Sequence, residues 1–137
     1  MKKILGFLVL TILVLSTVGT VAAMEGHVKS SLVPVEGSGI TGIVQVVQLP
    51  KGGTNIHVVA FGLTPGNEYV SLYYENHTCE LEPYAEDDVI GTYTANAAGA
   101  GTTHCKLEDD LDEVNSISVR RASDFMLLAC ADIHPSP

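Results

Sequence analysis

The feature that most constrains the fold is a regular series of short β-prone runs separated by turn residues. The runs are rich in Val, Ile, Thr and Tyr, and clusters of Gly, Pro, Asn and Asp lie between them. The eight runs cover residues 27–35, 40–49, 56–61, 68–74, 89–95, 101–107, 115–121 and 125–133. No segment keeps a helical period. This spacing is typical of an antiparallel sandwich or barrel, so we predict an all-β fold.

Alternation within the runs predicts which side chains share a face of the sheet. In residues 68–74, Val70 and Leu72 alternate with Ser71 and Tyr73. We expect Val70 and Leu72 to point into the core, and Ser71 and Tyr73 to share the opposite face. Exposed tyrosines would then either cover the rim of the sandwich or form a binding patch. The candidates for such a patch are Tyr69, Tyr73, Tyr84 and Tyr93.

The N-terminus has the pattern of a secretory signal peptide. Lys2 and Lys3 precede an apolar run, residues 4–21, and small residues end the segment at Ala23. We expect cleavage after Ala23, which defines residues 1–23 as the signal and 24–137 as one domain. The alternative is a retained membrane anchor, because about 20 apolar residues span a bilayer. Polar residues dilute the second half of the run, so we favour a secreted or periplasmic protein without stable membrane insertion after cleavage.

The charge of the chain excludes several classes of partner. Sixteen acidic residues stand against seven Lys and Arg, and the formal net charge is −9. Two of the lysines belong to the expected signal, so no basic stripe remains for phosphate backbones. Nucleic acids and anionic membrane surfaces are therefore not expected partners. The acidic stretch 108–113 lacks the spacing of a calcium-binding loop, and we expect it to be a solvated connection.

Four segments, in order along the chain, resemble those of the copper/zinc superoxide dismutases. "GITGIVQVVQ" resembles the second strand of that family, and "TNIHVVAFGLTPG" its third strand and the turn that follows. "TANAAGAGTT" resembles a family hairpin and "LLACADI" the closing strand. The resemblance covers nearly all of residues 24–137. It implies an eight-stranded antiparallel Greek-key β-sandwich or barrel of the superoxide dismutase type.

The three cysteines allow three pairings when only their number is considered. In the family that the chain resembles, a cysteine just after the fourth strand bonds to one in the last strand. The resemblance thus implies a disulfide between Cys79 and Cys130, with Cys105 left as a free thiol in a strand. Closing a loop of about fifty residues would stabilise the fold by roughly 4 kcal/mol.

The metal ligands of the family are missing from this chain. In the family, the strand after the Gly-Leu-x-Pro-Gly turn carries a His-x-His pair that binds copper, and here Ser71 and Tyr73 match those positions. Residues 80–91, where further ligands should follow, contain no histidine, and neither do residues 118–125. Dismutation needs a bound metal that changes oxidation state. The resemblance therefore implies a retained fold without catalytic residues, metal or other cofactor, and a protein that is not an enzyme.

Five histidines remain, and none of them forms a His-x-His or His-x-x-x-His pair; they are His27, His57, His77, His104 and His134. Whether they bind a metal stays open at this point. We predict a binding or structural module for an unidentified protein or small-molecule ligand. The alternative is a divergent copper/zinc-binding superoxide dismutase or a periplasmic copper-handling protein. A homodimer is compatible with the resemblance, although no stretch identifies its contact.

Overall fold

The computed structural model describes residues 26–83 and 88–134, and the expected signal segment and Tyr84 lie outside these ranges. Within these ranges eight strands follow one another, and the short 3₁₀ helix η4 lies before β7. Their bounds are β1 His27–Pro34, β2 Thr41–Gln48, β3 Thr54–Phe61, β4 Glu68–Tyr74, β5 Val89–Thr94, β6 Gly101–Leu107, η4 Leu111–Glu113, β7 Ser116–Arg121 and β8 Leu127–Asp132. All eight predicted strands are therefore confirmed.

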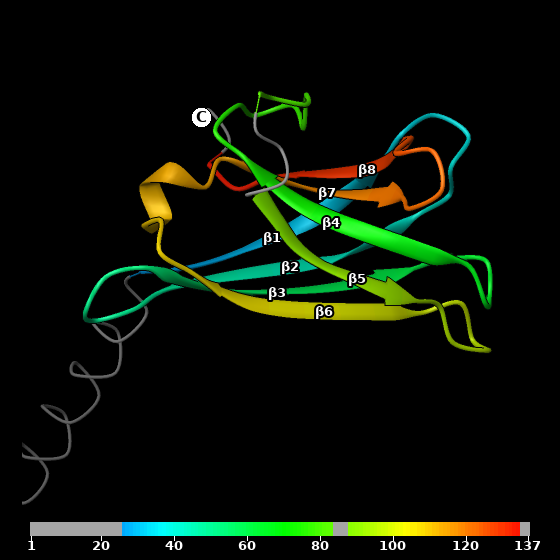
Figure 1. Ribbon diagram of the computed structural model, residues 1–137, viewed down its shortest axis with the longest axis horizontal. Coiled ribbons are helices and arrows are strands. Elements are labelled where there is room, and N and C mark those ends of the chain that lie inside the picture. The colour runs from blue at the N-terminus through cyan, green and yellow to red at the C-terminus, as the bar shows by residue number, and fades with distance from the viewer. Residues whose placement is uncertain (1–25, 84–87, 135–137) are drawn as a thin grey trace, which may run out of the picture.

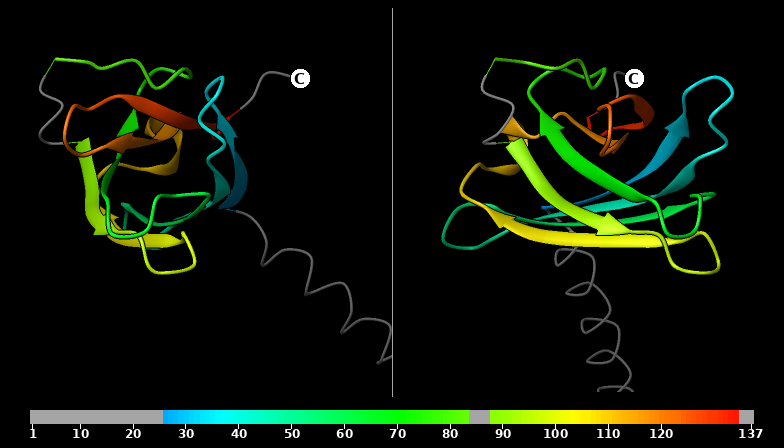
Figure 2. Two further views of the ribbon diagram at one scale, coloured as in Figure 1. Left: turned by 90° about the vertical axis from the view of Figure 1, so that its right-hand side faces the viewer. Right: turned by 45° about the vertical axis from the view of Figure 1, so that its right-hand side comes forward.

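The strands form one antiparallel sheet in the order β5-β4-β7-β8-β1-β2-β3-β6. The sheet curls until its edge strands, β5 and β6, lie close together, so that it nearly closes into a barrel (Figures 1 and 2). Glycines permit this approach. A Cβ atom on Gly91 of β5 would clash with Thr103 Oγ1, and one on Gly101 of β6 would lie 2.7 Å from the Tyr93 ring.

The interior of the barrel is filled by the inward-facing side chains of the strands. In β3, Ile56, Val58 and Ala60 are buried while His57 and Phe61 are exposed, as period-two alternation predicts. The same core contains buried residues from β2 and from β7. Burial of this apolar surface supplies the main favourable contribution to folding.

The connection between β6 and β7 carries the acidic stretch and is bound to the sheet. Asp110 Oδ1 accepts hydrogen bonds from Gln48 Nε2 at 3.0 Å and from the Gly53 amide at 2.8 Å. These two bonds stabilise the carboxylate and lower the pKa of Asp110. The acidic connection is therefore held against the β2–β3 turn, and the Asp110 side chain has a structural role there.

Candidate functional site

The structure reverses the expected orientation of β4. Tyr69, Ser71 and Tyr73 do share one face, but that face is the interior of the barrel. Val70 and Leu72 belong to a second apolar cluster on the other side of the sheet. The expectation that Val70 and Leu72 enter the main core is thus wrong. Both faces of β4 are covered, and every residue from Tyr69 to Tyr74 is buried, so alternation alone could not tell the two faces apart.

Both side chains at the positions matched to the copper ligands have partners inside the barrel. Ser71, which is 0% exposed, lies 2.8 Å from the Tyr93 hydroxyl. The Tyr73 hydroxyl donates a hydrogen bond to Asp109 Oδ2 at 2.9 Å. Burial, followed by the hydrogen bond and negative charge of Asp109, raises the pKa of Tyr73 far above its usual value. Tyr73 therefore stays protonated at physiological pH and acts as a donor.

The described tyrosines among the four candidates are not exposed, so they neither form a binding patch nor cover the rim of the sheet. The exposed fractions of Tyr69, Tyr73 and Tyr93 are 3%, 7% and 8%. Tyr69 and Tyr93 stack at 6.4 Å between ring centroids, and burial raises the pKa of Tyr93 to about 12. These rings belong to the barrel interior.

The outer side of β4 and β7 is covered by residues 75–83, and we call it the closed face. Val70, Leu72 and Tyr74 of β4 pack there against Cys79, which forms a disulfide with Cys130 of β8. This is the pairing that the resemblance implies, and Cys105 is free. Burial raises the pKa of the Cys105 thiol.

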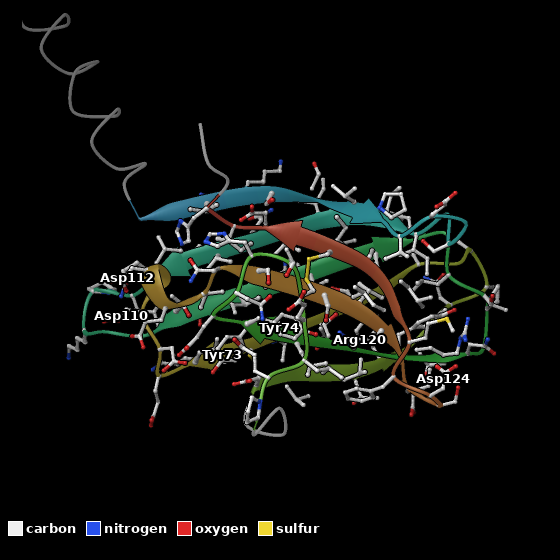
Figure 3. All side chains as sticks on the ribbon, turned by 90° about the horizontal axis from the view of Figure 1, so that it is seen from above. Tyr73, Tyr74, Asp110, Asp112, Arg120 and Asp124 are labelled. Atoms are coloured by element: carbon white, nitrogen blue, oxygen red, sulfur yellow. A yellow bond between two sulfur atoms is a disulfide. The ribbon has the colours of Figure 1, made fainter. Side chains whose placement is uncertain are left out.

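Arg120 of β7 organises the polar part of the closed face (Figure 3). Its side chain is only 6% exposed. The guanidinium donates to Tyr74 Oη at 2.9 Å, to the Cys79 carbonyl at 2.7 Å and to the Phe125 carbonyl at 2.7 Å. Tyr74 Oη also lies 2.7 Å from Ser118 Oγ. The acceptors of these three hydrogen bonds from Arg120 are all neutral oxygens, one hydroxyl and two carbonyls.

The two carbonyl oxygens that accept hydrogen bonds from Arg120 both belong to residues with a strained backbone conformation. Cys79 and Phe125 are the non-glycine residues with positive φ in the described part of the chain, at 58° and 62°. Such conformations are costly and persist only where surrounding contacts enforce them. At Cys79, the amide also donates to Ser116 Oγ. The closed face is thus a sealed, hydrogen-bonded structure, and no histidine contributes to its apolar cluster or to the Arg120 network.

The outward side of β1, β2, β3 and β6 is the second candidate surface, and we call it the open face. These four strands contain no Asp or Glu, although the chain has 16 acidic residues. Lys29 of β1 and Lys106 of β6 are exposed there. Large apolar side chains are also exposed on these strands, namely Val33, Ile43, Val47 and Phe61. The open face is therefore apolar and weakly basic on an otherwise acidic protein.

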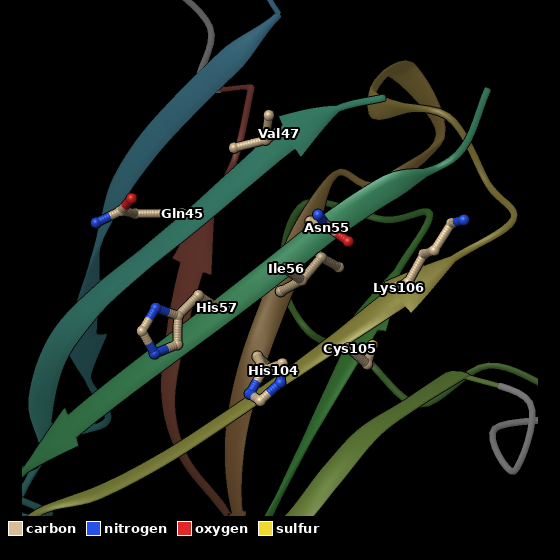
Figure 4. A pocket seen from close by; sticks show the side chains of 8 residues that line it. All are labelled: Gln45, Val47, Asn55, Ile56, His57, His104, Cys105 and Lys106. Carbon is tan, nitrogen blue, oxygen red and sulfur yellow. The ribbon is translucent and has the colours of Figure 1, made fainter. Parts of the chain in front are cut away.

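A pocket of about 570 Å³ lies on the open face (Figure 4). His57 and His104 line it and lie directly opposite each other in the β3–β6 pairing. Their ring centroids are 6.3 Å apart, and the ring planes are almost perpendicular at 86°. The sequence could not reveal this pair, because the two histidines are far apart along the chain and only the strand register brings them together.

The other histidines do not join this pair. His77 lies on the segment that covers the closed face, with Nδ1 2.8 Å from Asp132 Oδ1. His134 Nε2 lies 2.8 Å from the Leu111 carbonyl, and His27 begins β1. None of these three lines the open-face pocket, although His27 pairs with the lining residue Val47.

Comparison with known proteins does not add a family to these observations. The chain matches no family model, and no curated protein matches it significantly. Between residues 26 and 134, leaving aside 84–87, there is no helix with the length and apolar character needed to cross a membrane. A disulfide in such a domain is compatible with an extracellular location.

Proposed function

We propose that this chain is an exported, superoxide-dismutase-like Greek-key domain without a catalytic metal site, and that it acts as a binding module. The fold proposal is supported by the strand order, in which the connections from β3 to β4 and from β6 to β7 join the two halves of the sheet. It is also supported by the four family-like segments and by the Cys79–Cys130 bond.

The non-catalytic part of the proposal rests on the surroundings of β4. Ser71 and Tyr73 point into the barrel, where their hydroxyls have partners. The other side of the strand carries Val70, Leu72 and Tyr74 beneath the disulfide. A redox metal needs several fixed imidazole or thiolate ligands, and neither side of β4 offers an imidazole.

We expect purified protein, incubated with copper and zinc and then washed with chelator, to show no superoxide dismutation above a buffer control. The double substitution Ser71→His and Tyr73→His should not restore activity, because both new imidazoles would enter the packed interior. It should also lower the melting temperature through overpacking. Metal-dependent dismutation by the unmodified protein at rates near those of an enzyme would contradict the proposal.

The open face is the surface best suited to binding. Its strands place Lys29 and Lys106 among exposed apolar side chains and contribute no carboxylate. Complementary charge steers partners and suppresses wrong ones. We therefore assign to the open face a protein partner whose contact surface combines acidic and aromatic side chains.

A fluorescent peptide of alternating Glu and Phe is a suitable probe of this surface. We expect binding at low ionic strength, measured by anisotropy, that weakens as salt is added. Changing Lys29 and Lys106 together to Glu should weaken binding by about tenfold or more. Changing Lys51, between β2 and β3, and Arg121 of β7 together to Glu alters the net charge equally but outside the strands of the open face, and should have a smaller effect. Equal losses in both variants, or no binding, would refute this assignment.

A further inference from the structure

We propose that His57 and His104 form a two-imidazole site for a divalent transition-metal ion on the open face. The site lies on the outer surface of the barrel, whereas Ser71 and Tyr73, which match the copper positions, are buried inside it. The existence of the site does not depend on the proposed binding function. Both side chains are exposed and leave neighbouring strands at directly opposed positions. Side chains placed in this way start about 5 Å apart, so a change of rotamer at His104 can bring one of its nitrogens to an ion bound at His57.

The hydrogen bonds of Thr102 assign the ligating nitrogen of His57. The Thr102 hydroxyl has a single hydrogen, which it uses to donate a hydrogen bond to the Val58 carbonyl at 2.9 Å. In its 3.0 Å contact with His57 Nε2 the hydroxyl must therefore accept, so Nε2 carries a proton. In neutral His57 the free lone pair then lies on Nδ1. Metal-binding histidines commonly donate their second N–H to a fixed acceptor, and Thr102 supplies one here as a positioning residue.

The surroundings of the pair favour particular ions. Imidazole nitrogen binds copper, nickel and zinc, and affinity among the divalent ions is highest for Cu²⁺. Gln45 faces His57 from β2 in the same cross-strand row, and the pocket leaves space for water as the remaining ligands. Lys106 is the next outward residue on β6, and its positive charge opposes a cation. Removing that charge should strengthen metal binding.

The test is a titration of the metal-free, untagged protein with Cu²⁺, followed by calorimetry and by electron paramagnetic resonance. We expect nitrogen hyperfine splitting from two imidazoles. His57→Asn and His104→Asn should each weaken binding by at least about tenfold. Thr102→Val should weaken it by about tenfold while the two-nitrogen spectrum is kept. Lys106→Gln should strengthen it.

The same substitution at other histidines shows whether Cu²⁺ binds to this pair or to imidazoles elsewhere in the protein. His27→Asn, beside the expected mature N-terminus, and His77→Asn, beside Asp132, should leave the Cu²⁺ affinity unchanged. Because His57 and His104 are exposed, their variants should keep the wild-type melting temperature in metal-free buffer. Unchanged Cu²⁺ affinity in both open-face variants would refute the site, and so would loss of binding in His27→Asn or His77→Asn instead. A spectrum with one nitrogen from this pair would also refute it.

Discussion

Replacing Cys79 and Cys130 with serine is expected to lower the free energy of unfolding by about 4 kcal/mol. The bond joins residues 51 positions apart, so its loss enlarges the conformational freedom of the unfolded chain. A domain of this size has a total stability of about 5–15 kcal/mol, and the loss is therefore a large part of it. Urea unfolding followed by tyrosine fluorescence measures the change, since the chain contains five Tyr and no Trp.

Cys105→Ser provides the matched control for this result. Cys105 is free and only partly buried, so the same chemical change there should cost less than about 1 kcal/mol. Reducing agent should shift the unfolding midpoint of the wild type toward that of the double variant and leave the double variant unchanged. A wild-type midpoint that is insensitive to full reduction would contradict the prediction.

Arg120→Met is expected to destabilise the protein by about 3 kcal/mol or more. The substitution retains apolar bulk but removes the donors for Tyr74 Oη and for the carbonyls of Cys79 and Phe125. Leaving buried acceptors without partners costs about 1–3 kcal/mol each. It also releases the two backbone segments that contain the positive-φ residues. Amide hydrogen exchange should therefore become faster in residues 75–83 and 122–126.

The neighbouring residue supplies the control for Arg120. Arg121 forms an exposed ion pair with Asp124 at 3.0 Å, and such pairs contribute about 0–1 kcal/mol. Arg121→Met makes the same chemical change and should shift the unfolding free energy by no more than that. Equal effects of the two substitutions would show that the Arg120 hydrogen bonds are not important for stability.

Both predictions concern the closed face, where the sequence was a partial guide. The resemblance implied the Cys79–Cys130 pair, because the segments that contain the two cysteines match in order. The role of Arg120 was not visible, because an arginine in a strand of alternating polar residues reads as exposed. The tertiary structure buries it, because carbonyls from residues 75–83 and from the segment between β7 and β8 accept its hydrogen bonds.

The amino-acid sequence by itself determined the local structure. Turn residues and period-two alternation located all eight strands. The extended conformation of a strand, and its termination at turns rich in Gly and Pro, depend on residues that are close in the sequence. Tertiary structure alone decided which side of β4 is interior, because period two is symmetric and both sides of that strand are buried. It alone set His57 opposite His104, because register between distant strands follows from closure of the whole sheet.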